Sequence, residues 1–312
     1  MRKITLYFIL LSMYLHACTF STSTAQNIID AVDLKAEGIQ NLEVEGRFCK
    51  VTIEAVSGNT LAFDGKITSS KDVDAYKIKT QQNGSTLRVW IENAEGKSWK
   101  FMNNVNGELN FKVPKSINCI VDNSSGSVNV TGLAGGKVSL KASSGSVKAS
   151  QIHSNAYFKT SSGSLRLNDI TGRCEAESSS GSQQWSNIKG NINTHASSGA
   201  LRFEEVKGDI DAYTSSGSIS MKRIEGQLQL KCSSGAIHGD AIKLTASSNF
   251  KTSSGSINLA LINPVNDLGF DLNANSGNLK VGDMKADDKL YLNRGNIKII
   301  GVSSSGSQRY YN

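Results

Sequence analysis

The phrase Ser-Ser-Gly-Ser, or a close variant of it, returns at a nearly constant interval through much of the chain. Successive central glycines are about 18 residues apart. The interval is identical in the five steps from Gly145 to Gly235, and it is slightly longer in the step before them and in the two steps after them. A period in this range indicates one supersecondary unit stacked on copies of itself, as in repeat proteins. The glycines that define the period are Gly126, Gly145, Gly163, Gly181, Gly199, Gly217, Gly235, Gly255 and Gly277.

One repeat unit, residues 216–233, shows the local pattern. Apolar side chains alternate with polar ones on both sides of a Glu-Gly break, at Ile219, Met221, Ile224, Leu228 and Leu230. This period of two is typical of two β-strands joined by corners and not of a helix. Units stacked in parallel at about 4.8 Å give every strand two neighbours and every apolar column a continuous core. We therefore predict an all-β fold, a single-stack β-solenoid (β-helix) with coils of about 18 residues, whose marked coils span roughly 40 Å.

Small residues mark both corners of each unit. Glycine adopts positive φ without steric cost, and serine is small enough to stack on itself while its hydroxyl binds turn backbone groups. A second set of glycines marks the other corner, at Gly172, Gly190, Gly208 and Gly226. We therefore interpret the repeated serines as structural punctuation, because no neighbouring residue activates one as a nucleophile.

The repeat also divides the chain into regions. Residues 26–121 lack the serine phrase but keep alternating strands, so we expect an irregular N-terminal cap and the first coils there, with the amphipathic segment 28–42 covering the open end. Residues 122–300 are predicted to form the regular solenoid, with insertions at 241–250 and 262–268. Residues 301–312 are predicted to be a polar C-terminal tail.

Residues 1–25 have the pattern of an export signal. Two basic residues precede a short apolar stretch, and small residues lead to a cleavage site between Ala25 and Gln26. The apolar stretch is too short to span a membrane. Lipidation of Cys18 is the alternative, because Leu15-His16-Ala17-Cys18 is similar to a lipobox apart from its histidine. Either route predicts an exported protein that is periplasmic, associated with the outer membrane or secreted, and that meets a membrane only through a lipid anchor.

Four cysteines follow the signal, and none has the spacing of a metal or redox motif. Cys119 and Cys174 fall in apolar columns, so they are expected to be buried small hydrophobes. A Cys49–Cys119 disulfide is an open alternative in an oxidising compartment. We predict neither a metal nor a cofactor.

The recurring serine phrase, the offset Ile-x-Gly corner and the preceding segment Phe111-Lys112-Val113-Pro114-Lys115 together resemble the bacterial "putative adhesin" domain family of unknown function. They are also similar to the head domains of auto-transporter adhesins. The resemblance covers about residues 43–300 and implies a right-handed β-solenoid on an exported or envelope-associated bacterial protein. It carries no agreed catalytic residues. Gln183 and Trp185 depart from the pattern, which puts the packing of their coil in question.

The charge pattern narrows the class of partner. The formal net charge is +7, but the basic residues are scattered along the chain and do not form a run. Nucleic acid is therefore not expected as a partner, whereas an anionic cell-surface glycan or an envelope protein is. Outward positions of the first strand align Lys148, Arg166 and Arg202, with His238 further along, as a possible ligand-facing column. The competing interpretation is that these side chains only keep a sheet face soluble.

An enzyme is the alternative function, because parallel β-helices also host polysaccharide-cleaving glycosidases and lyases. Asp209 and Asp211 would lie about 7 Å apart on one strand, and Glu175 and Glu177 form a similar pair. Neighbouring coils offer Asn and Gln at these positions, and the histidines fall in different columns, so no catalytic arrangement is indicated. The sequence therefore favours a non-enzymatic adhesin-like or cell-envelope scaffold protein.

Overall fold

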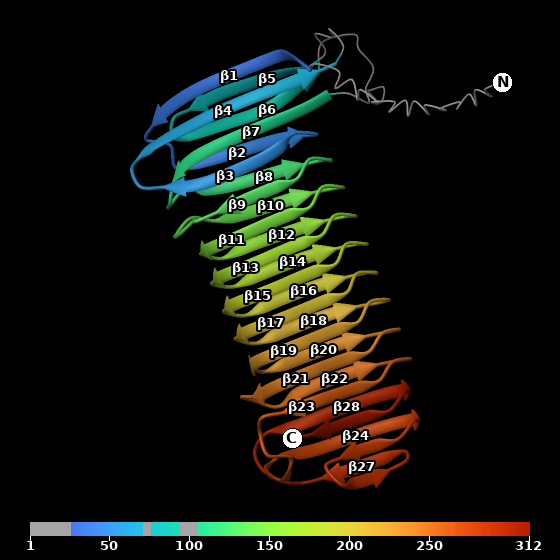
Figure 1. Cartoon of the computed structure of the whole chain (residues 1–312). Helices are drawn as coiled ribbons and strands as arrows, with labels where there is room; N and C mark the ends of the chain where they lie inside the picture. Colours follow the sequence, from blue (N-terminus) through green and yellow to red (C-terminus); the bar gives the residue numbers. More distant parts are fainter. Residues whose placement is uncertain (1–25, 71–75, 94–104) are drawn as a thin grey trace, which may run out of the picture.

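The computed structural model describes residues 26–70, 76–93 and 105–312. Two long sheets run along a rod, one of 15 strands (sheet A) and one of 14 strands (sheet B). Figure 1 shows the regular coils in the middle of the rod, with the N-terminal strands at one end and the C-terminal strands at the other. The predicted single-stack β-solenoid is confirmed.

Each regular coil contributes one strand to each sheet, and corresponding strands pair in parallel. From Val147 to Ile237 the register advances by the same interval at every coil. The sheet A strands are β9 (Val128–Thr131), β11 (Val147–His153), β13 (Leu165–Thr171), β15 (Gln183–Lys189), β17 (Leu201–Lys207), β19 (Ile219–Gly226), β21 (Ile237–Leu244) and β23 (Ile257–Leu261). The sheet B strands are β8 (Asn118–Asn123), β10 (Val138–Ala142), β12 (Ala156–Thr160), β14 (Cys174–Ser178), β16 (Ile192–Ala196), β18 (Ile210–Thr214), β20 (Leu228–Cys232) and β22 (Ser248–Thr252).

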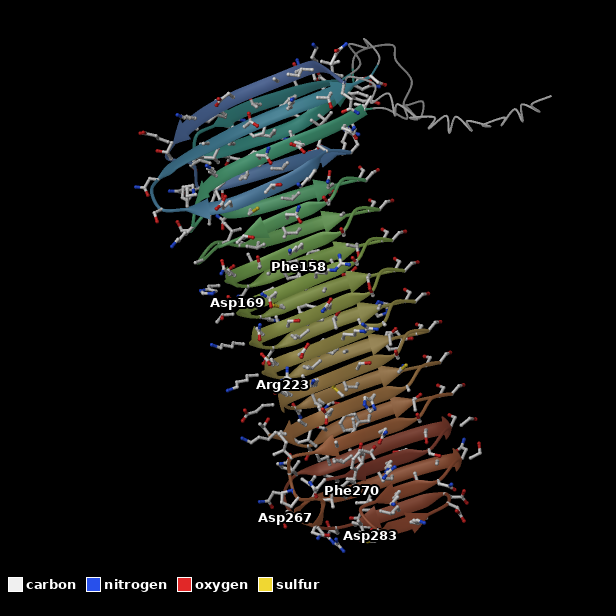
Figure 2. The ribbon with its side chains drawn as sticks, viewed as in Figure 1. Phe158, Asp169, Arg223, Asp267, Phe270 and Asp283 are labelled. Atoms are coloured by element: carbon white, nitrogen blue, oxygen red, sulfur yellow. The ribbon has the colours of Figure 1, made fainter. Side chains whose placement is uncertain are left out.

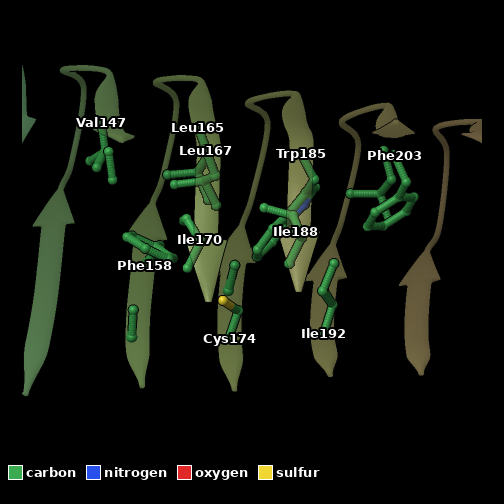
Figure 3. Packing of buried hydrophobic residues seen from close by; sticks show 14 of the residues in the cluster. Val147, Phe158, Leu165, Leu167, Ile170, Cys174, Trp185, Ile188, Ile192 and Phe203 are labelled. Carbon is green, nitrogen blue, oxygen red and sulfur yellow. The ribbon is translucent and has the colours of Figure 1, made fainter. Parts of the chain in front are cut away.

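The core lies between the two sheets. Because successive side chains of a strand point to opposite faces, the alternating apolar residues of both sheets meet inside the rod. Leu167, Trp185 and Phe203 follow one another in one buried column, and Cys174 and Ile192 face them from sheet B (Figure 3). The columns predicted from the sequence therefore form one continuous core.

The glycine corners are required for a different reason from the one we expected. None of the corner glycines from Gly126 to Gly255 has φ in the left-handed region. A Cβ atom on Gly199 would instead fall on the backbone carbonyl oxygen of Gly181, and the other corners repeat this contact. Backbone hydrogen bonds of 2.7–2.9 Å, such as Ser198 N–H to the carbonyl of Ser179, join each corner to the next. Glycine is thus selected because stacked backbones leave no space for a side chain.

Backbone groups at these corners are satisfied from the core side and not by the repeated serine hydroxyls. The residue that ends each sheet B strand is buried, and several of these residues bond to a corner glycine. The Thr160 hydroxyl donates to the carbonyl of Gly163 at 2.7 Å, and the Cys232 thiol donates to the carbonyl of Gly217 at 2.8 Å. Cys232 therefore takes the place of a hydroxyl residue in this column.

The opposite corner contains the left-handed backbone. Gly172, Gly190 and Gly208 have φ of 134–147° there, as the sequence predicted, whereas Gly226 of the same set does not have positive φ. Nearby, one non-glycine residue in each of six successive sheet A strands also has positive φ, between 55° and 57°. These residues are Gln151, Asp169, Asn187, Glu205, Arg223 and Ala241. Each bends its strand toward the corner, and the bends stack along one edge of the rod.

The unusual coil with Gln183 and Trp185 is fully packed. Both side chains are completely buried. The Gln183 amide donates to the Ser178 hydroxyl at 3.0 Å, and its oxygen accepts from the Thr194 hydroxyl at 2.5 Å and from the Trp185 indole at 3.3 Å. A buried amide with all these partners avoids the cost of an unsatisfied polar group. The question raised by the sequence is thereby resolved.

The N-terminal cap is built from strands that leave the stack and return to it. β2 (Asn41–Arg47) and β3 (Lys50–Val56) form the coil next to β8 and β9, and β6 (Thr86–Asn93) and β7 (Val105–Pro114) lie beyond them. Three antiparallel strands complete the cap: β1 (Asn27–Glu37), β4 (Thr60–Ser69) and β5 (Tyr76–Asn83). Only part of the segment 28–42 covers this end: β1 is at the edge of sheet A, whereas the start of β2 lies inside sheet B, whose edge strand is β5.

The C-terminal end differs from the sequence-based expectation. Residues 301–312 are not a tail, because β28 (Lys298–Ser305) and β29 (Gln308–Tyr311) pair directly with β22 and β23. β24 (Gly269–Ser276) and β25 (Leu279–Val281) lie outside them, although they come earlier in the chain. The antiparallel strands β26 (Met284–Ala286) and β27 (Lys289–Leu292) close the end, and the short 3₁₀ turn η1 (Val265–Asp267) precedes β24.

The corner sequences explain this order. The intact phrase Ser304-Ser305-Gly306-Ser307 stacks on Gly255, whereas the degraded phrase Asn275-Ser276-Gly277-Asn278 stacks on Gly306. Tyr310 is fully buried, with its ring 5.5 Å from that of Phe270 and 6.3 Å from that of Phe250. The end of the chain therefore joins the regular stack to its cap.

Replacing one corner glycine should destabilise the rod. We expect Gly199→Ala to lower the free energy of unfolding by about 1–3 kcal/mol or more, because the new methyl group overlaps a backbone carbonyl that cannot move alone. Ser198→Ala, in the same corner but exposed, should change it by less than about 0.5 kcal/mol. Urea denaturation followed by circular dichroism measures both, and equal midpoints for the two variants would contradict the close-stacking argument.

The role of the last strand can be tested in the same way. Tyr310→Ala should cost about 3–5 kcal/mol, because it empties a large buried aromatic site. Tyr311→Ala should cost much less, because the Tyr311 ring lies at the outer surface beside Arg309. If residues 301–312 lay outside the folded core, the two substitutions would have equally small effects on the free energy of unfolding.

Candidate functional site

The outer face of sheet A carries a continuous column of basic residues. The strand register places Lys148 beside Arg166, Arg166 beside Gln184, and Gln184 beside Arg202. Ser220 and His238 continue the column. The ligand-facing residues predicted from the sequence therefore lie on one face of the rod, and all three cations are exposed.

The column continues through residues that the sequence analysis missed. Asn258 lies beside His238, Arg309 beside Asn258, and Lys280 beside Arg309. Lys285 faces Lys280 across the β25–β26 hairpin. We call the ten residues from Lys148 to Lys285 in this spatial order the basic column. Its last three cations escape a search at the constant interval of the repeat, because the last coils carry insertions and β29 stacks out of chain order.

Charges of one sign are directly adjacent in the basic column. Lys148 pairs with Arg166, Arg309 with Lys280, and Lys280 with Lys285. Like charges facing each other across strands are destabilising, and none of the ten residues is acidic. Within the described residues, these cations make no ion pair with a carboxylate. The column thus concentrates positive charge that no ion pair neutralises in the described residues, although Glu204, Asp240, Asp283 and Asp287 lie two residues along the chain from one of its members.

Elsewhere on the rod, several cations are paired with carboxylates. Arg223 contacts Glu204 at 2.6 Å and Glu205 at 2.7 Å, and these two hydrogen bonds, Glu205 first, raise the pKa of its guanidinium. Lys243 lies 2.7 Å from Glu225. The lack of compensating carboxylates in the basic column is therefore not a general property of the described surface.

The two flanks of the basic column differ in chemistry. On the side of the glycine corners, small residues such as Ser146, Ser164 and Ser182 precede each strand. On the other side lie Glu204 and Asp240, with Lys222 between them, and all three join Arg202 and His238 in lining a shallow groove of about 410 Å³. An anionic ligand would therefore be expected to lie toward the serine side of the cations.

A larger groove follows the opposite long edge. It has a volume of about 660 Å³ and runs over the stacked positive-φ residues, with the buried Ile188 and Ile224 beneath its polar rim. Figure 2 shows Asp169 and Arg223, two of its lining residues, at this edge of the rod. Most charges on its rim are paired with one another, so the groove offers less uncompensated charge than the basic column.

The carboxylate pairs considered for sugar cleavage have structural partners. The Asp209 carboxylate accepts the backbone N–H of Gln227 at 2.9 Å, and Asn191 makes the equivalent bond one coil earlier. The Lys159 ammonium bonds Glu177 at 2.7 Å, and this bond, before others, lowers the pKa of that carboxyl. Glu175 lies 3.3 Å from Arg173. A general acid needs a raised pKa, so Glu177 is poorly suited to that role.

The histidines and cysteines do not form a reactive centre in the part of the chain that the structure describes. His153, His195 and His238 lie in different columns, and no three metal-ligating side chains gather there. Cys49 and Cys119 are free and buried, so the alternative of a disulfide between them is not realised. Burial raises the pKa of both thiols to about 12, which leaves them unreactive.

The export features lie mostly outside the described residues, which begin at Gln26. Cys18 and Ala25 belong to the segment that is not described. The Thr68 hydroxyl donates to the Gln26 side-chain oxygen at 2.9 Å, next to the start of β1. The described residues contain no helix long and apolar enough to cross a membrane.

Comparison with known proteins identifies a family. The family model described as Toastrack DUF4097 matches residues 101–213 and 176–310, which together cover well over half of the chain. No curated protein matches.

Three solved structures of low sequence identity also align with the chain. They are a "putative cell adhesion protein" of Clostridium sporogenes (12% identity, 90% of this chain and 99% of that one, TM-score 0.20), a "putative adhesin" of Bacteroides fragilis (9%, 90% and 96%, 0.27) and a "putative lipid binding protein" of Parabacteroides distasonis (14%, 89% and 96%, 0.33). Similarity at these TM-scores supports no conclusion about function.

Proposed function

The chain belongs to the Toastrack DUF4097 family, and we propose that it is a non-enzymatic, exported adhesin-like or cell-envelope scaffold protein that binds an anionic surface glycan along the outer face of sheet A. The family is one of unknown function, so the proposal depends on the chemistry of this chain's own surface. The observation that carries it is the basic column.

The basic column is energetically unfavourable in the protein without a ligand. Adjacent like charges destabilise a sheet, and the same fold neutralises its charges at Arg223, Lys159 and Lys243. A polyanion would supply the missing compensation, because each carboxylate or sulfate could contact cations of successive coils. The stacked backbone holds these cations in a row before binding, so little ordering of the protein is needed.

The same observations favour binding over cleavage. Asp209 and Glu177 are held in structural contacts, and the lowered pKa of the Glu177 carboxyl does not suit a general acid. A rigid row of cations stabilises the bound polymer along its whole length. It does not place a catalytic group at one glycosidic bond. Incubation with the polymer should therefore give retention without the release of shorter products.

Removing the three central cations tests the proposal. We expect the variant with Lys148→Gln, Arg166→Gln and Arg202→Gln to bind immobilised polygalacturonate at least about 10-fold more weakly than the unmodified chain, since three contacts of about 0.5–1 kcal/mol are lost. Glutamine suits this position because Gln184 already occupies it one coil away. Retention measured at increasing sodium chloride concentration provides the comparison.

A matched control removes the same net charge elsewhere. Lys189, Lys207 and Lys251 are exposed and lie off the basic column, so their replacement by glutamine should leave retention nearly unchanged. If both triple variants lost the same amount of binding, net charge and not the basic column would explain the retention. Unchanged binding in the central variant would remove Lys148, Arg166 and Arg202 from the proposal.

A further inference from the structure

The basic column contains two separate groups of cations. The central cluster is Lys148, Arg166 and Arg202, and the distal cluster is Arg309, Lys280 and Lys285. Ser220, His238 and Asn258 lie between the clusters. The two clusters come from different kinds of coil, because Arg309 joins the distal one only through the insertion of β29 between β23 and β25.

The spacing of the clusters sets the length of ligand that can use both. Neighbouring strands are about 4.8 Å apart, so the four steps from Arg202 to Arg309 span about 19 Å and the nine steps from Lys148 to Lys285 about 43 Å. A short anionic oligomer can contact only one cluster at a time. A linear chain longer than the gap reaches both, and the second contact is then intramolecular.

The distal cluster is denser than the central one. Arg309, Lys280 and Lys285 occupy three consecutive positions, whereas Gln184 interrupts the central cluster. Lys280 and Lys285 face each other in a hairpin of two three-residue strands, where an opposite charge would stabilise the pairing. The Arg309 guanidinium lies 4.8 Å from the centre of the Tyr311 ring, which holds its charge at the outer face.

Resting on the proposed function, we infer that the ligand is a long, linear polysaccharide with one carboxylate per sugar, and that it bridges the two clusters in the direction of the rod axis. A sugar residue advances an extended chain by a length close to one coil step, so successive carboxylates meet successive strands. A branched polymer would be held at one cluster only, because the cations form a single row. The distal cluster is therefore a second binding site that makes affinity depend on ligand length.

Linear oligogalacturonates of defined length test this inference on the full chain. The tetramer should bind either cluster alone, and the decamer should bind about 100-fold more tightly because it occupies both. The slope of log affinity against log salt should be about twice as steep for the decamer, since about twice as many ion contacts form. A fully methyl-esterified decamer, which lacks the charge, should not bind.

A distal variant with Lys280→Gln, Lys285→Gln and Arg309→Gln isolates the second site. It should bind the decamer about as weakly as the tetramer, while binding the tetramer within about two-fold of the unmodified chain. An unchanged circular dichroism spectrum and a melting temperature that is not lowered show that the C-terminal cap is intact. Glutamine keeps the bulk of these side chains, and the three positions lie on the outer face, so the core contacts of Tyr310 and Leu279 remain.

The experiments distinguish failure of the bridging inference from failure of the proposed function. Equal affinity for tetramer and decamer, or full decamer binding by the distal variant, overturns the bridging inference and leaves the proposed function standing. If the unmodified chain binds no oligogalacturonate of any length, the proposed function fails and the inference fails with it. Binding of the esterified decamer would overturn the requirement for carboxylates.

Discussion

The structure depends on how closely its corners approach one another. A Cβ on Gly163, Gly181, Gly199 or Gly217 would overlap the carbonyl oxygen of the corner before it, so the backbone of one coil is the packing surface of the next. The absence of a Cβ lets the corners of the regular coils stack at the sheet spacing of about 4.8 Å, and the backbone hydrogen bonds of the corners add to those of the sheets. The aliphatic columns follow, because a constant step brings equivalent side chains into register.

A stack of identical coils has two open ends, and both are closed by the same device. At each end the chain leaves the stack, builds antiparallel strands, and returns to fill the place beside the last regular coil. β8 returns next to β2, and β28 returns next to β22. The outermost strands are therefore antiparallel additions and not another parallel coil, so the exposed edge differs from the template that the stack itself would extend.

The same arrangement shapes the surface that we propose as functional. Coils in strict chain order would place Lys280 directly beside Asn258, since each stands three residues after its corner glycine. The return of β29 instead places Arg309 next in the row and brings Lys280 and Lys285 behind it. The cap that protects the end of the solenoid thus also lengthens its charged face, and stability and binding depend on the same terminal strands.

The sequence by itself determined the regular coils, the buried columns and the alignment of Lys148, Arg166 and Arg202, because alternation along a strand and the size of a corner residue are local properties. It also held the signal for the C-terminal strand, the intact phrase Ser304-Ser305-Gly306-Ser307, although the polar composition of residues 301–312 indicated a tail. Only the tertiary structure decided where that phrase stacks, that Gln183 and Trp185 satisfy each other in the core, and that Lys280 and Lys285 extend the row. Every open coil edge offers the same backbone donors and acceptors, so hydrogen bonding alone does not decide which strand pairs with it. The strand that pairs is the one whose corner and core side chains fit those of the last coil.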